Sequence, residues 1–181
     1  MKKHVTASLL TFAMFASPAS AQLEGFENGP VFEGFGPTAK VEANVQIPKD
    51  TTFKIAFDVK DKAKPEKLSR SFESAARFIN MHVAAGVPIE NIKLVVVVHG
   101  SAAIDLTRDA IYKSRNEGAP NPSAAAVAEM QEQGVEFHLC GQSAVAYKLK
   151  NEDLLPGVKM SLSAMTSHAL LQQQGYSLNP F

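Results

Sequence analysis

The sequence predicts an α/β fold in which a parallel sheet carries helices on both faces. Short apolar runs rich in strand formers alternate with segments of helical periodicity. The run Ile92–Val98 (IKLVVVV) is continuously apolar, which is typical of a strand covered on both faces of a parallel sheet. The helical segments between the strands have the length that connects parallel neighbours.

The predicted elements begin at residue 52. Residues 52–59 (TFKIAFDV) alternate and are rich in strand formers, so they form the first strand. A helix follows over residues 65–85, because Pro65 suits a first helical turn, Gly86 suits the exit, and one face is apolar at helical spacing. The later strands are expected over residues 92–98, 135–139, 158–162 and 176–178, the last of them at an edge.

Four more helices are expected between these strands. Ser123 is a natural N-cap for one of them, and Gly134 is a natural end. A loop with two prolines precedes Ser123. The four helices are predicted over residues 102–112, 123–133 and 142–150, and from Ser163 or Thr166 to Gly175.

Residues 1–21 have the pattern of an export signal. Two lysines make a basic start, residues 5–15 are apolar, and the segment ends in the small-residue pattern Ala-Ser-Ala. The apolar stretch is about half of the ~20 residues that span a bilayer, so cleavage after Ala21 is favoured over a retained anchor. We expect a periplasmic mature chain with no membrane span.

Residues 22–50 differ in composition from the domain of residues 51–181. They are rich in glycine and proline, lack helical periodicity and contain scattered phenylalanines. One interpretation is an extended arm that packs on the domain with its aromatic side chains as anchors. The other is a strap that clasps a neighbouring subunit. The first is favoured because terminal segments are usually ordered only when they are docked.

Composition excludes several classes of function. The chain has 181 residues, 18 basic and 18 acidic, with neither sign gathered in blocks, so we expect no nucleic-acid partner. It has a single cysteine and no clustered histidines, so neither a zinc site nor another cofactor is expected. No glycine-rich phosphate loop or G-x-S-x-G elbow is present. The charges at residues 58–62, and the pair Asp105 and Asp109, are interpreted as solvated.

Two strand ends carry reactive side chains. In open α/β sheets, ligands bind outside the carboxyl ends of the strands. The candidate site residues are His99, Gly100 and Ser101 after the second strand, and Cys140, Gly141, Gln142 and Ser143 after the third.

Cys140 is the centre of the predicted chemistry. Only a thiolate attacks or carries sulfur, and a helix start offers N–H groups that favour the thiolate. Gly141 clears the approach, and Gln142 and Ser143 could donate further hydrogen bonds. The alternative is an inert cysteine buried at the edge of the core. Export favours function slightly, since a lone thiol is a liability in an oxidising compartment.

His99 is the candidate partner of Cys140, as a base or as a cation, provided that their strands are neighbours. The alternative is a histidine satisfied by backbone groups. His138 shares the face of Cys140 but lies one pleat deeper. His82, beside the apolar face of the first helix, is expected to be structural, and His168 has no visible partner.

Residues 53–176 resemble the DsrE/DsrF-like family, which includes sulfur-relay proteins. No single landmark is specific, but their order and spacing together are. The landmarks are residues 53–59, Val98-His99-Gly100, Asn121-Pro122, residues 134–142, residues 155–158 and residues 171–176.

The resemblance implies a three-layer α/β/α domain with a mainly parallel five-stranded sheet, assembled into trimers or hexamers. In the relay members a cysteine accepts a sulfane sulfur as a persulfide, and Cys140 is the only position here that could inherit this role. The relay proteins act in the cytoplasm, whereas this chain carries an export signal.

The preferred hypothesis is a periplasmic sulfur carrier that uses Cys140 as the persulfide acceptor. Its sulfur donor or acceptor would be a protein or a small sulfane-sulfur compound. Two alternatives remain open: an oligomeric module that binds a small ligand or a partner without turnover, and a thiol redox sensor.

Overall fold

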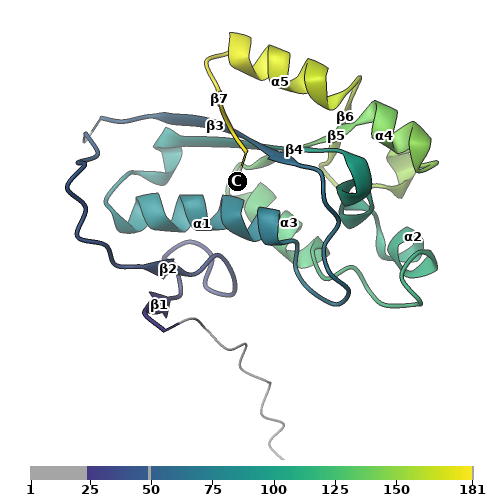
Figure 1. Ribbon diagram of the computed structural model, residues 1–181, viewed down its shortest axis with the longest axis horizontal. Coiled ribbons are helices and arrows are strands. Elements are labelled where there is room, and N and C mark those ends of the chain that lie inside the picture. Colours follow the sequence, from purple (N-terminus) through teal and green to yellow (C-terminus); the bar gives the residue numbers. More distant parts are fainter. Residues whose placement is uncertain (1–23, 49, 181) are drawn as a thin grey trace, which may run out of the picture.

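The computed structural model describes residues 24–48 and 50–180, and a parallel sheet of five strands forms its centre (Figure 1). The strands lie in the order β6-β5-β4-β3-β7. All four pairings are parallel, so the predicted α/β class and the five-stranded sheet are confirmed. Their bounds are β3 Phe53–Val59, β4 Ile92–Val98, β5 Glu136–Cys140, β6 Lys159–Ser161 and β7 Ser177–Asn179.

The direction of the crossovers decides which helix covers which face. From β3 to β6 the chain moves steadily toward one edge, and α1 (Arg70–Ala84) and α3 (Ala124–Glu132) cover the same face. From β6 the chain returns to place β7 beyond β3. A right-handed crossover in the reverse direction must pass over the opposite face, where α5 (Ala164–Gln173) lies (Figure 1).

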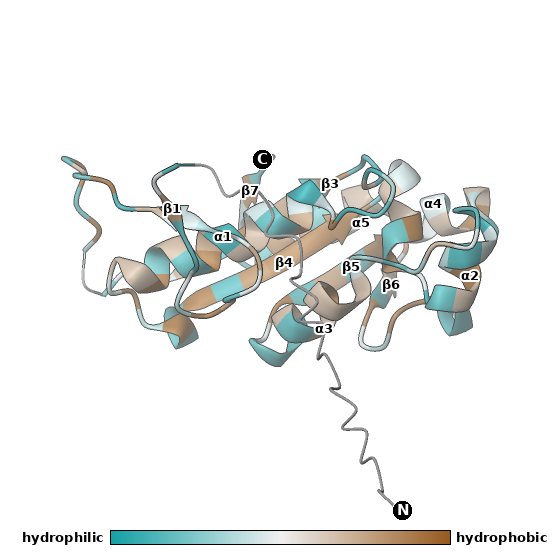
Figure 2. Ribbon diagram, turned by 90° about the horizontal axis from the view of Figure 1, so that it is seen from below, coloured by the Kyte–Doolittle hydropathy of each residue, from teal (hydrophilic) through white to brown (hydrophobic). Residues whose placement is uncertain are grey.

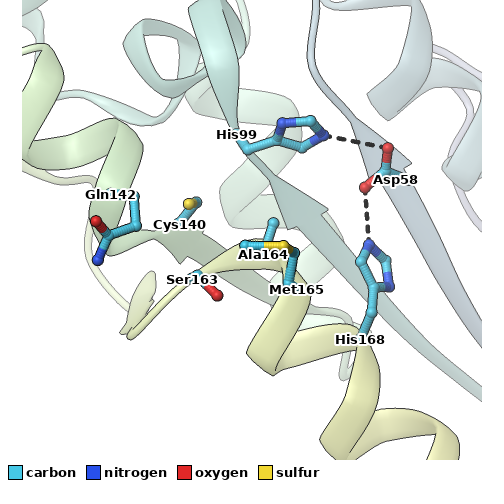
Figure 3. Close-up of a pocket in the computed structure, with 8 residues that line it drawn as sticks. All are labelled: Asp58, His99, Cys140, Gln142, Ser163, Ala164, Met165 and His168. Carbon is cyan, nitrogen blue, oxygen red and sulfur yellow. Dashed lines mark hydrogen bonds and ion pairs between the residues drawn. The ribbon is translucent and has the colours of Figure 1, made fainter.

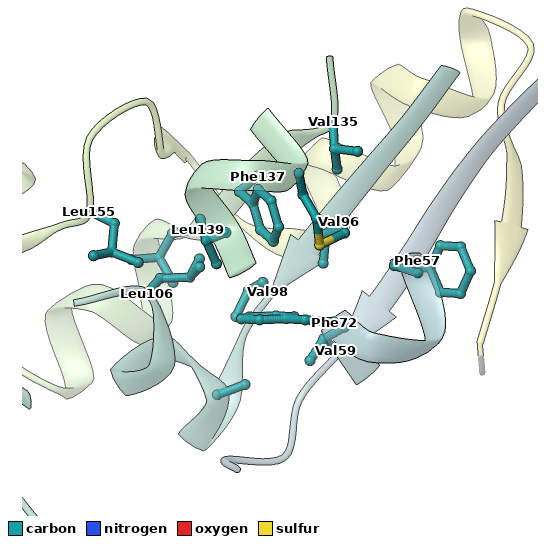
Figure 4. Close-up of a cluster of buried hydrophobic side chains, with 14 of the residues drawn as sticks. Phe57, Val59, Phe72, Val96, Val98, Leu106, Val135, Phe137, Leu139 and Leu155 are labelled. Atoms are coloured by element: carbon teal, nitrogen blue, oxygen red, sulfur yellow. The ribbon is translucent and has the colours of Figure 1, made fainter. Parts of the chain in front are cut away.

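The pleat divides the buried side chains between two cores. In β4, a brown band along its length in Figure 2, alternate valines face opposite sides of the sheet. Toward α1 and α3 lies the large core of Figure 4, where the rings of Phe72 and Phe137 meet edge to face at 5.3 Å. Toward α5 lies a smaller core of mostly small side chains: Ala56, Val95, Val97, Cys140, Ala164 and Leu171.

The first helix is shorter than the prediction of residues 65–85. It begins at Arg70, because Glu66 adopts a left-handed φ of 57°, which a helix does not accommodate. The chain before Arg70 is held by a long-range hydrogen bond instead: the Ser69 N–H donates to Ser123 Oγ at 3.1 Å. Ser123 does precede α3, but its hydroxyl makes no capping bond.

The predicted helix over residues 102–112 is two elements. A 3-10 helix, Gly100–Leu106, is followed by α2, Asp109–Ser114. Thr107 separates them in extended conformation and forms a β-bridge with Leu154. The next predicted helix, residues 142–150, is likewise shorter: α4 spans Gly141–Ala146, and Lys148 has a φ of 53°. Ser163 caps α5 by accepting the Thr166 N–H at 3.0 Å.

The described part of the arm packs on α1 of its own chain. Its short strands β1 (Phe26–Glu27) and β2 (Thr38–Ala39) pair antiparallel. Between them, the fully buried Asn80 of α1 accepts the Phe32 N–H at 2.9 Å and donates to Phe32 O at 3.0 Å. A Cβ at Gly29 would lie 1.9 Å from Asn80 Cγ, so only glycine permits this approach. The predicted signal segment lies outside the described residues.

None of the helices in the described ranges combines the length and apolar character needed to cross a membrane.

Asp105 is buried, contrary to the prediction of a solvated acid. It is 0 % exposed, and its Oδ2 accepts the Ala63 N–H at 2.7 Å. Among the described residues, Oδ1 has no hydrogen-bond partner, and neither does the buried hydroxyl of Tyr112. Burial raises the pKa of Asp105 to about 6, against the opposing effects of the Ala63 N–H and Lys62. Asp109 lies on a different element, α2, and is exposed.

We expect the folded protein to lose stability between about pH 4 and pH 6 through Asp105, because folding favours its protonated form. This contribution is complete below the ordinary pKa of 3.8 and is lost as the pH rises through about 6. It amounts to about 3 kcal/mol. The free energy of unfolding can be measured with urea for the wild type and Asp105→Asn at several pH values. The difference between the two should shift in favour of the variant as the pH rises. A difference independent of pH would contradict the raised pKa of Asp105.

Candidate functional site

A cavity of about 400 Å³ opens on the α5 side at the carboxyl end of the sheet (Figure 3). Its walls come from β3, the end of β5, the residues after β4 and β5, and the start of α5. The lining residues are Asp58, His99, Cys140, Gln142, Ser163, Ala164, Met165 and His168.

Strand register brings the distant parts of this wall together. Val98 pairs with Leu139, so one residue further His99 and Cys140 stand next to each other at the ends of β4 and β5. Val98 also pairs with Val59 of β3. Since these three residues face the large core, the residue beside each of them faces α5.

The sulfur of Cys140 lies at the meeting point of two helix starts. The residue is only 6 % exposed, yet it lines the cavity. Burial raises the pKa of the thiol, but donors outweigh it and hold the pKa below its ordinary value. The donors are, in order, the backbone and the hydroxyl of Ser143, then the backbones of Ala164 and Gln142. Cys140 makes no regular capping bond to α4, which spans only six residues, so local N–H groups act here rather than a long helix dipole.

Ser143 is oriented toward this role by Gly100. The Gly100 N–H donates to Ser143 Oγ at 2.9 Å, which leaves the hydroxyl proton for the sulfur. Gly100 has a φ of 55°, and a Cβ there would lie 2.8 Å from the carbonyl oxygen of Lys60. Gly141 is equally confined, since a Cβ would lie 2.6 Å from the carbonyl oxygen of Ser161. The two glycines thus permit these close backbone approaches next to His99 and Cys140.

Asp58 joins two imidazoles on the wall away from Cys140 (Figure 3). Its Oδ1 lies 2.7 Å from His168 Nε2, and its Oδ2 lies 3.2 Å from His99 Nε2. Burial acts to raise the pKa of Asp58, but the hydrogen bonds from His168 and His99 outweigh it, so the pKa is lowered and the carboxylate stays ionised. The cavity therefore has a thiol of lowered pKa on one side and an imidazole–carboxylate–imidazole chain on the other.

The structure brings together only some of the predicted site residues. His99 and Gln142 line the cavity with Cys140, and Ser143 lies beside the sulfur. Ser101 is directed elsewhere, since its hydroxyl donates to Lys60 O at 3.2 Å and accepts the Lys62 N–H at 3.0 Å. The catalytic and binding roles of these residues stay predictions.

Sequence reasoning missed Asp58 and His168. Asp58 was interpreted as part of a solvated charged loop, and His168 had no partner. The alternation of β3 could have identified Asp58. It places this side chain on the face opposite to Phe57 and Val59, at a strand end beside His99. Ser163, Ala164 and Met165 were also missed as lining residues, since nothing local indicates that α5 starts over the cavity.

His138 belongs to a separate cavity of about 310 Å³, deeper along β5. Its Nδ1 lies 2.7 Å from Ser167 Oγ, and its Nε2 lies 3.1 Å from Glu136 Oε2. His82 is buried on α1, with Nδ1 2.7 Å from Phe78 O, as expected of a structural histidine. In the described ranges, no three or more histidine, cysteine or acidic side chains are grouped so as to hold a metal ion.

Comparisons with known proteins identify the fold and the family. Two solved structures are similar, each over 71 % of this chain with a TM-score of 0.50. One is MTH1491 of Methanobacterium thermoautotrophicum, a protein of unknown function, at 21 % identity over 99 % of its chain. The other is YchN of E. coli, at 15 % identity over 100 % of its chain. Both likenesses concern the fold alone.

A comparison with curated proteins gives no match. The sequence profile of the DsrE/DsrF-like family matches residues 54–180, which is the whole domain from β3 to β7. The chain therefore belongs to the DsrE/DsrF-like family.

Proposed function

We propose that this protein is a sulfur carrier in which Cys140 accepts a sulfane sulfur and holds it as a persulfide. The observation that carries the proposal is the position of the sulfur: it lines a cavity and is surrounded by donors that favour the thiolate. Membership of the DsrE/DsrF-like family supports it, because sulfur relay is an activity of that family.

The transfer step requires only the cysteine and a donor persulfide. The Cys140 thiolate attacks the outer sulfur of R–S–SH, and a new sulfur–sulfur bond forms. The donor's own sulfur–sulfur bond breaks, and its electron pair leaves on R–S⁻. The sulfur of Cys140 is thereby oxidised and that of the leaving thiol reduced. An acceptor thiolate later takes the outer sulfur by the same displacement.

The cavity suits a carrier better than an open surface would. Its volume of about 400 Å³ leaves room for an added sulfur atom and for the end of a donor. The low exposure of Cys140 shields a persulfide from oxidants and from unrelated thiols. The same N–H groups that favour the thiolate would also stabilise the terminal persulfide anion.

We further propose a periplasmic location and a homo-oligomer, with a trimer or hexamer as the expected form. The location is supported by the signal pattern of residues 1–21. The assembly is supported by large apolar side chains left exposed on α4 and around the start of α5: Val145, Leu162 and Met165. Met165 also lines the cavity, so an associating surface there would border its entrance.

Incubation with a sulfane donor should add one sulfur atom to the intact mass of the wild-type protein. Cys140→Ser should show no gain, because it lacks the nucleophile. If the wild type gained nothing and its thiol resisted alkylation, the structure would serve a binding module instead. A mass gain that corresponds to a mixed disulfide with a small thiol, or a dimer that reducing agent dissolves, would favour a redox sensor.

Light scattering over a range of concentrations should show a species larger than the monomer. Met165→Asp should shift it toward the monomer, because it places a charge where a side chain 79 % exposed would be covered. Met81→Asp, at an exposed methionine on α1, is the matched control and should leave the mass unchanged. A monomeric wild type would rule out the assembly, and equal effects of both variants would exclude this surface as the interface.

A further inference from the structure

The carboxylate of Asp58 and the two imidazoles that share it come from three elements that are far apart in the sequence. Asp58 lies on β3, His99 directly follows β4, and His168 lies on α5 (Figure 3). Both contacts use Nε2 of the ring, at 3.2 Å for His99 and 2.7 Å for His168. The proposed persulfide chemistry of Cys140 does not by itself require this arrangement.

Resting on the proposed function, we infer that Asp58 and His168 are positioning residues that hold His99 as the proton donor to the leaving thiolate. His99 is the imidazole that strand register places next to Cys140. Asp58 holds its Nε2, so Nδ1 is the ring atom left to face a substrate. His168 contacts the second carboxylate oxygen and fixes the orientation of Asp58.

The composition of the cavity wall limits which group can act as the proton donor. The titratable groups that line it are Asp58, His99, His168 and Cys140, and none of its described lining residues is lysine, arginine or glutamate. Among these titratable lining groups, the two imidazoles next to Asp58 are the ones that can give a proton to a leaving thiolate.

The complete step balances with one proton. The Cys140 thiolate, the donor R–S–SH and the His99 imidazolium give the Cys140 persulfide, the thiol R–SH and a neutral imidazole. One sulfur–sulfur bond forms as another breaks, and the electron pair of the broken bond takes the proton from His99. No direct hydrogen bond between His99 and Cys140 is needed, because the donor lies between them in the cavity.

The nature of the leaving group makes this inference testable. An alkyl thiolate is strongly basic and leaves more readily when it is protonated. Thiosulfate transfers its outer sulfur with release of sulfite, a weaker base that needs little help. Alkylation by iodoacetamide releases iodide, which takes no proton. Loss of a proton donor should therefore slow only the first of these reactions.

The experiment compares the rates of all three reactions in the wild type, Asp58→Asn, His168→Gln and the control Asp61→Asn. Asp61 is an exposed residue of the loop after β3. With an alkyl persulfide donor such as glutathione persulfide, Asp58→Asn should lose about 100-fold in rate, and His168→Gln less but in the same direction. Their rates with thiosulfate and iodoacetamide should stay within about twofold of the wild type, as should every rate of Asp61→Asn.

Two results would overturn the inference while leaving the carrier function intact. One is wild-type rates in both cavity variants with the alkyl persulfide. The other is an equal slowing of all three reactions, which would indicate a distorted cavity rather than a lost proton donor. A wild type that takes no sulfur from either donor would instead refute the proposed function itself. Should Asp58→Asn fail to fold, His168→Gln decides alone by the same comparison.

Discussion

The middle strands β3, β4 and β5 are buried on both faces. Because side chains alternate along a strand, each residue faces either the large core or α5. Once Val59, Val98 and Leu139 face the large core, their neighbours Asp58, His99 and Cys140 have to face α5. A slip of one residue in any of these strands would turn a charged group into the core and remove it from the cavity. The packing of the large core thus fixes the geometry of the chemistry on the other side of the sheet.

The opposite face is free to hold a cavity because so little covers it. The crossover from β6 to β7 reverses direction, which brings α5 over this face, whereas the short α4 packs its buried Ala144 in the large core. The core beneath α5 consists mostly of small side chains, so the helix packs on the sheet and begins directly over Cys140. The Ala164 N–H is therefore available to the sulfur, together with the donors of α4.

Local pattern was enough to predict the fold. The period of two in β3 and the apolar run of β4 identify strands without reference to anything distant. Prediction failed where long-range contacts decide the structure: Ser69 is held by Ser123, and Thr107 is paired with Leu154. The site shows the same division. Cys140 and His99 stand out as reactive residues at strand ends, whereas His168 acquires its partner only when α5 folds over a strand 110 positions away in the chain.

The proposed chemistry of Cys140 depends on a thiolate that donors stabilise despite its burial. Titration of the thiolate by ultraviolet absorbance, with Cys140→Ser as the blank, measures this directly. We expect a midpoint below the ordinary thiol value of about 8.5, and a higher midpoint in Ser143→Ala, which removes the hydroxyl donor. A wild-type midpoint at or above about 8.5 would contradict it, because burial would then outweigh the donors.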